Sequence, residues 1–388
     1  MDVIVGRSRI PIDTAVFLDL FENSAVSERA PVQHALETSE ISYPALVELA
    51  RTAQIPHPLF FAPLSMVRQQ VRAKTEKLMQ GVRPDTFTVN TRTTIRLADV
   101  ELIVKDLLRK QALLRRHDPT LVRNPIVGLL KKPRRSIKED ADALTSALGL
   151  DLAAVRALGR KDFALESLIA KLEANQILVS RSVQNYMPQR ITVHFSGMTV
   201  RDTKVPYIFL AGGNHQDDQE PAGRQIFTLT LMTVLIARGI FAPVTFNARS
   251  AAPSGRREYG IVEEVLMPAA ELHGLDLTDL DAVVAAADRF KVTPSAMTVR
   301  ALHTGIISHA LADDFLQELQ TQFRNATKPR PRQPKPVTAI RKYNGRELVS
   351  RLLGAVDDHR LPASEFYRVV CMNRLGPADL GELRAAIR

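Results

Sequence analysis

The spacing of apolar residues after residue 97 predicts a long amphipathic helix that begins near Asp99. Apolar side chains recur three and four residues apart, the interval at which positions on an α-helix share one face. These apolar positions are Val100, Ile103, Val104, Leu107 and Leu114. Basic residues occupy the other faces, at Lys105, Arg109, Lys110, Arg115 and Arg116. The pattern therefore predicts that one face of this helix packs in a core and that its other faces are basic and solvated.

Shorter helical patterns flank this helix. Residues 11–80 are expected to form short helices, the clearest at 44–51, and Pro56 closes that stretch because proline cannot continue a helix. Ser136 and Glu139 have the spacing of a capping box that opens a further helix. Residues 163–175 repeat the helical spacing, and helices resume from Glu263.

Between these helical stretches, β-branched and aromatic residues predict a small sheet. The expected strands are residues 177–180, 191–195 and 207–210. Their short spacing favours an antiparallel meander over crossover connections. A Gly/Asn/Asp loop then leads into an apolar helix that starts near Pro221, a residue suited to a first helical turn.

Composition and charge indicate a globular protein with an affinity for acidic partners. The chain has 388 residues, enough for several compact units, and 45% of them are hydrophobic. A net charge of +10 favours nucleic acid or an acidic protein, although a solvated arginine-rich surface explains it equally well. Cys371 is the single cysteine, which excludes an intrachain disulfide. No signal-peptide or membrane-span pattern is present, so a cytoplasmic protein is expected.

The middle of the chain, from Phe163 to Ile307, resembles the ImmA/IrrE family of zinc peptidases in the order of its short motifs. The matching segments are residues 174–179, 195–197, 206–210, the Arg-x-x-Phe-Thr-Leu at 224–229, the Val-Leu-Met-Pro at 265–268 and the Arg-Phe-x-Val-Thr at 289–293. The resemblance implies a zincin-like fold. It also implies a His-Glu-x-x-His motif directly after residue 229, because two histidines one helical turn apart bind zinc and the glutamate activates its water.

The residues at those positions cannot perform this chemistry. Leu231 and Leu235 stand where the family has histidines, and Met232 stands where it has glutamate. The family's third ligand falls on Arg257, with Glu258 beside it. Because ligands and base are lost together, the resemblance predicts an inactive site filled by core side chains, with no catalytic residue, metal or cofactor.

Residues 37–61 resemble the end of an XRE-type helix-turn-helix, a frequent companion of this family. The expected recognition region then contains Arg29, Gln33 and His34, which become candidate DNA contacts. A worn structural remnant is the alternative. The other polar candidates are interpreted as structural or solvated: His215, Asp217 and Asp218 in a turn, His194 in a strand, His303 and His309 in a helical stretch, and Ser254 in a loop.

Together these patterns predict an α+β fold that is mostly helical. The expected units are a helical, helix-turn-helix-like domain (1–80), connecting helices (81–160), a zincin-like ImmA/IrrE domain with a small antiparallel sheet (161–325), a basic Pro-rich linker (326–342) and a small C-terminal helical segment (343–388). The predicted function is a non-catalytic regulatory protein, antitoxin-like or from a phage or mobile element. Its expected partner is a protein such as a PIN-like ribonuclease toxin, with DNA left open as a second partner. The alternatives are a DNA-binding repressor with a sensor domain and an active zinc peptidase that cleaves a repressor.

Overall fold

The computed structural model describes residues 1–22, 24–27, 29–78, 97–193, 196–212, 220–244, 256–325 and 334–387. Within these ranges the protein is mostly helical, with two small mixed sheets, which confirms the expected α+β class. Buried apolar side chains form three separate clusters. One cluster belongs to the N-terminal unit, and the other two lie on opposite faces of the second sheet. Among the described residues, no helix has the length and apolar character to span a bilayer.

The N-terminal unit contains a three-stranded sheet, so the expectation that it is entirely helical is wrong. Strands β1 (Asp2–Val5) and β2 (Ser8–Pro11) pair antiparallel, and β3 (Glu40–Ser42) pairs parallel to β1. Only the two residues 6 and 7 connect the first pair, and Gly6 has a φ of +61°. Glycine adopts this conformation without a Cβ clash, as the first position of a type II′ hairpin turn requires. The β-branched run at residues 3–5 and this glycine are the signals of the hairpin.

Helices pack around this sheet. They are α1 (Thr14–Phe21), α2 (Ala30–Thr38), α3 (Tyr43–Thr52), a 3₁₀ turn η1 (His57–Phe61) and α4 (Leu64–Leu78). Phe17, Phe21 and Phe60 form the aromatic centre, and the ring centroids of Phe21 and Phe60 lie 4.8 Å apart. The Ser42 hydroxyl caps α3 by accepting the Ala45 N–H.

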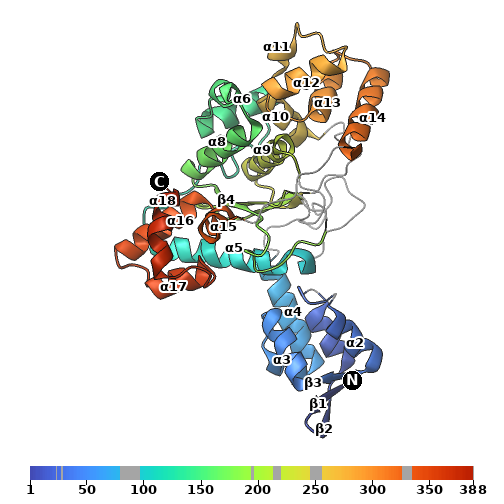
Figure 1. Ribbon diagram of the computed structural model, residues 1–388, viewed down its shortest axis with the longest axis vertical. Coiled ribbons are helices and arrows are strands. Elements are labelled where there is room, and N and C mark those ends of the chain that lie inside the picture. Colours follow the sequence, from blue (N-terminus) through green and yellow to red (C-terminus); the bar gives the residue numbers. More distant parts are fainter. Residues whose placement is uncertain are drawn as a thin grey trace.

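The N-terminal unit contacts the rest of the chain through α4 and α5 (Leu97–His117) (Figure 1). The carboxylate of Glu101 on α5 is fully buried, and it pairs with Lys74 of α4 and with Lys105 one turn along α5. Glu101 also accepts the Ala25 N–H at 3.2 Å. This buried acid therefore holds α4, α5 and the loop between α1 and α2 together.

The second sheet has the strand order β4-β6-β5-β7 and is mixed, so the predicted antiparallel meander is wrong. Strand β6 (Tyr207–Leu210) pairs parallel to β4 (Leu178–Arg181) and antiparallel to β5 (Gly197–Val200). The short β7 (Pro243–Val244) pairs with β5. Residues 201–206 connect β5 to its neighbour β6 and are short enough for a hairpin. Residues 182–196 form a longer connection from β4 to β5, and β6 lies between these two strands.

The strands expected at 177–180 and 207–210 are present, within one residue, as β4 and β6. The strand expected at 191–195 is wrong over 191–193, where the chain is a loop with a buried Ile191; residues 194–195 lie outside the described ranges. The strand forms instead at Gly197–Val200, where every residue is buried. Gly197 and Met198 give this segment a weak β signal in the sequence. Burial therefore selects the segment more than local propensity does.

Helices cover both faces of the second sheet (Figure 1). Val179, Ile208 and Leu210 contact the cluster of α8 (Lys161–Ala174) and α9 (Ala222–Arg238). Leu178, Tyr207 and Phe209 point to the opposite face, toward α5 and α15 (Pro336–Asn344). Alternate residues of a strand point to opposite faces, so a strand buried on both sides must be apolar throughout, as Tyr207–Leu210 is.

The C-terminal helices belong to this core rather than forming a separate small segment. They are α15, α16 (Arg346–Asp357), α17 (Ala363–Val369), the 3₁₀ turn η3 (Pro377–Asp379) and α18 (Leu380–Ile387). Their apolar residues share one cluster with α5 and the sheet. The expected linker at 326–342 is helical from Pro336 onward, and its residues 326–333 lie outside the described ranges.

The remaining helices extend the other side of the molecule, beyond α9 (Figure 1). They are α6 (Ile137–Leu148), α7 (Leu152–Ala157), α10 (Arg257–Leu266), α11 (Ala269–Leu272), α12 (Leu280–Arg289), α13 (Pro294–His303) and α14 (His309–Asn325). At the start of α6, the Ser136 hydroxyl accepts the Glu139 N–H, as predicted, while the Glu139 carboxylate accepts the Arg135 N–H.

Candidate functional site

Helix α9 carries the positions at which the resemblance places a metal site. The helix lies against β5 and β6 on one side and between α8 and α10 on the others. Leu231, Met232 and Leu235 are 1%, 0% and 5% exposed, and all three belong to one apolar cluster. Leucine offers no donor atom to a metal, and methionine supplies no imidazole or carboxylate. The helix is therefore packed as a core helix along this segment.

Met232 packs directly on the backbone of β5. A Cβ atom placed on Gly197 would lie 2.8 Å from Cε of Met232 and would collide with the carbonyl oxygen of Phe209. Real Cβ contacts are never this short, so only glycine allows α9 and β6 to approach β5 so closely. The methionine fills the volume that the absent side chain leaves, in keeping with its role as an adaptable core residue.

The two positions proposed for a third ligand serve as ion-pair partners. Arg257 opens α10 and contacts Asp140 of α6 at 2.7 Å, and Asp140 itself is fully buried. Glu258 contacts Arg238, the last residue of α9, at 3.1 Å. Both pairs lie near the C-terminal end of α9 and fix α6 and α10 against it. Among the described residues, no group of three or more His, Cys, Asp or Glu side chains is arranged to hold a metal ion.

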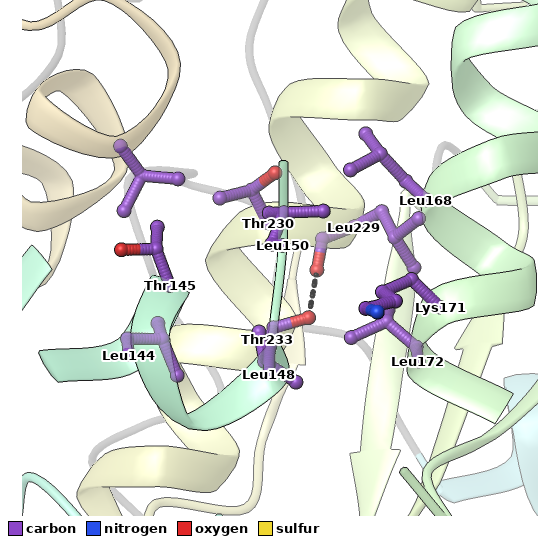
Figure 2. Close-up of a pocket in the computed structure, with 11 residues that line it drawn as sticks. Leu144, Thr145, Leu148, Leu150, Leu168, Lys171, Leu172, Leu229, Thr230 and Thr233 are labelled. Atoms are coloured by element: carbon purple, nitrogen blue, oxygen red, sulfur yellow. Dashed lines mark hydrogen bonds between the residues drawn. The ribbon is translucent and has the colours of Figure 1, made fainter. Parts of the chain in front are cut away.

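A small cavity lies between α6, α8 and α9 (Figure 2). Its volume is about 20 Å³, and Leu229, Thr230 and Thr233 of α9 line it together with residues of α6 and α8. The hydroxyls of Thr230 and Thr233 donate to the carbonyls of Ile226 and Leu229 in their own helix, and Figure 2 shows the second of these bonds. Such a volume holds one water molecule, whereas ligand pockets measure ~300–1,000 Å³. This cavity therefore cannot serve as a substrate site.

The candidate DNA contacts lie at the start of α2. Arg29 is the exposed residue before the helix, and Gln33 and His34 are exposed within it. The Gln33 side chain donates to the Ser27 carbonyl at 2.9 Å and so closes the preceding turn. Residues 22–29 separate α1 from α2, and β3 separates α2 from α3. A helix-turn-helix has a turn of ~3–4 residues. The α1–α2 connection is longer than that, whereas the α2–α3 connection has four residues, 39–42, three of which form strand β3.

The other polar candidates either lie outside the described residues or form no site with one another. His194, His215, Asp217, Asp218 and Ser254 fall outside the described residues. His309 is exposed at the start of α14, and His303 Nδ1 lies 3.0 Å from Glu263 Oε1 on α10. Cys371 is fully buried, and this burial raises the pKa of its thiol to about 12. A thiol in that state is a poor nucleophile.

Several buried charges were not predicted from the sequence. Lys110, expected on a solvated face, is fully buried, and its ammonium lies 2.6 Å from Asp106 and 4.2 Å from the ring centre of Tyr343. Burial lowers the pKa of Lys110, against the attraction of Asp106. The Tyr343 hydroxyl donates to the same carboxylate at 2.8 Å. The i,i+4 spacing of Asp106 and Lys110 was the available signal, but it does not distinguish an exposed pair from a buried one.

A second unpredicted group is Glu173, the penultimate residue of α8. Its carboxylate is 4% exposed and accepts the Glu347 N–H at 3.3 Å, in the first turn of α16. Burial raises the pKa of Glu173 to about 7, while hydrogen bonds from the backbone of α16 act in the opposite direction. This acid therefore joins the two sides of the sheet through α8 and α16.

Comparison of the chain with protein-family models, with curated proteins and with solved structures gave no match.

Proposed function

We propose that this chain is a non-catalytic regulatory binding protein, antitoxin-like or from a phage or mobile element, built on a peptidase-like fold that has lost its metal site. The observation that carries the proposal is the burial of Leu231, Met232 and Leu235 at 5% exposure or less. A zinc peptidase needs two imidazoles, a carboxylate and an open coordination position for water. An apolar face pressed against β5 supplies none of these.

Loss of the metal site leaves the fold as a rigid scaffold for binding. A fold and its chemistry are separable, so a domain without its catalytic groups still presents a shaped surface. The proposed partner is a protein, for which the resemblance suggests a PIN-like ribonuclease toxin. A net charge of +10 supports an acidic partner surface.

The metal content of the purified protein tests the loss of the site. Tag-free protein from zinc-supplied cells, prepared without chelator, is expected to contain less than about a tenth of an equivalent of zinc. About one equivalent, lost in Glu258→Gln, would overturn the proposal. Arg238→Gln is the matched control because it breaks the same ion pair without removing a potential ligand.

The binding role is tested by co-expressing this chain with a PIN-like ribonuclease. Co-expression should yield a complex that survives gel filtration and in which RNA cleavage is inhibited. A ribonuclease that remains separate and fully active would exclude this partner. Because zinc is measured on the isolated chain, the two parts of the proposal can fail separately.

A further inference from the structure

Residues 131–139 form the longest stretch of consecutive exposed residues among those that the structure describes. The stretch reads Lys-Lys-Pro-Arg-Arg-Ser-Ile-Lys-Glu, with five basic residues and one acidic residue. Its first part, residues 131–135, is called the basic loop below. Arg256, also exposed, directly precedes the α10 residue that contacts this loop.

The backbone of the basic loop is fixed at both ends. Before it, the Leu130 N–H donates to the Ala237 carbonyl at 2.8 Å, and the Arg238 guanidinium donates to the Leu130 carbonyl at 2.9 Å. At its other end, the Arg257 guanidinium donates to the carbonyls of Arg134 and Ser136 at 2.8 and 3.0 Å. The loop therefore presents its side chains from a preorganised backbone, which lowers the entropy cost of binding.

The acidic groups around the loop are engaged in this scaffold. Asp140 is buried between Arg257 and the Arg134 N–H, and Glu258 pairs with Arg238. Glu139 accepts the Arg135 N–H, and Asp142 pairs with Lys138 at 2.6 Å. Lys131, Lys132, Arg135 and Arg256 form no ion pair with any described residue. Four cations without an ion-pair partner among the described residues thus lie on the basic loop and directly before α10.

We propose that the basic loop and Arg256 bind the phosphate backbone of a nucleic-acid duplex. Lysine and arginine side chains in this arrangement supply several donors to adjacent phosphates, and binding releases condensed counterions. A single strand is favoured less, because the loop offers no aromatic side chain on which bases could stack. Protein hot spots are enriched in Trp, Tyr and Arg; the loop supplies two arginines but no aromatic side chain.

This inference goes beyond the proposed function, because it adds a nucleic-acid partner to the proposed protein partner. It assigns nucleic acid to a surface of α6, α9 and α10, away from the exposed residues of α2. The zinc measurement and the duplex measurement remain independent. A protein with a full zinc site could still bind a duplex through the loop, and a zinc-free protein could fail to do so.

The test measures fluorescence anisotropy of labelled DNA and RNA duplexes of about 20 base pairs between about 50 and 200 mM salt. The loop variant combines Lys131→Ala, Lys132→Ala and Arg135→Ala, and it leaves every backbone contact of the loop in place. The matched control removes the same charge from exposed residues elsewhere, with Arg7→Ala, Arg51→Ala and Arg324→Ala. Both variants lower the net charge from +10 to +7, since each removes three positive charges.

The full-length protein is expected to bind one or both duplexes with an affinity that falls steeply with salt. In the loop variant the slope of log affinity against log salt should decrease by about 2–3, because each lost phosphate contact accounts for ~0.9. The control should keep the original slope. Three results would each overturn the assignment. The loop variant could bind as the unmodified protein does, or the single substitution Arg29→Ala could abolish binding. The protein could also bind poly-glutamate more tightly than either duplex.

Discussion

Replacing Glu173 by glutamine should make the stability of this protein less sensitive to pH. The folded protein raises the pKa of Glu173 from 4.5 to about 7 through burial. An acid with a raised folded pKa stabilises the fold only while protonated, so its contribution is complete below pH 4.5 and is lost as the pH rises toward 7. At 1.36 kcal/mol per pH unit, this difference corresponds to about 3 kcal/mol. Glutamine has the shape of the protonated acid and does not ionise.

The assay compares urea unfolding of the two proteins at pH 5 and pH 8.5 by circular dichroism. Other titrating groups are common to both proteins, so they cancel in the difference between the two free energies of unfolding. Relative to the unmodified protein, the free energy of unfolding of the variant should rise by about 2–3 kcal/mol from pH 5 to pH 8.5. Glu166→Gln, on the exposed side of α8, is the control and should change this difference by less than about 0.5 kcal/mol. A Glu173→Gln effect equal at both pH values would refute the argument.

Three further predictions concern buried positions. Introducing histidines at Leu231 and Leu235 together with glutamate at Met232 should lower the free energy of unfolding by more than about 3 kcal/mol, measured by thermal unfolding, because unpaired polar groups would be buried; an equally stable variant that bound zinc would contradict the packing. Gly345→Ala should lower the free energy of unfolding in urea by about 2 kcal/mol or more, because Gly345 has a φ of +81° and a Cβ there would lie 2.6 Å from the Val179 carbonyl oxygen. The control Gly354→Ala, which has open space around it in α16, should be neutral or stabilising. Equal losses of stability in the two variants would contradict this explanation. The Cys371 thiol, with a pKa of about 12, should resist an aromatic disulfide reagent at pH 8 until the protein is unfolded; rapid reaction of the native protein would show that the thiol is accessible.

The elements that could be predicted from the sequence are those whose apolar spacing is strong and local. The helix after Asp99 buries Val100, Ile103 and Leu107 as expected, and α9 starts directly after Pro221. The strand at Tyr207–Leu210 was identifiable because all four residues are apolar and mostly β-branched or aromatic. In these cases the local pattern and the tertiary environment favour the same structure.

The elements that could not be predicted depend on distant partners. Lys110 lies off the apolar face of its helix, and Tyr343 from α15 helps to bury it beside Asp106. Strand β5 has β-branched residues only at Thr199 and Val200, and its first half is set by the close approach of β6 and α9 to Gly197. The parallel pairing of β4 with β6 likewise depends on the path of residues 182–196, which no local pattern encodes. The apolar face of α9 is different, because the residue types at Leu231, Met232 and Leu235 alone exclude a His-Glu-x-x-His zinc site there.

The arrangement of the sheet explains how the apolar face of α9 contributes to the fold. Helix α9 contributes Leu231, Met232 and Leu235 to one side of the sheet, and the C-terminal helices cover the other side through Tyr343 and its neighbours. Glu173 connects the two sides, because its carboxylate lies between the end of α8 and the first turn of α16. Burial of Leu231, Met232 and Leu235 contributes about 1.5–3 kcal/mol each to this layered core. This apolar face of α9 therefore stabilises the core, and a partner would contact surfaces outside it, of which residues 131–139 are the longest exposed stretch among the described residues.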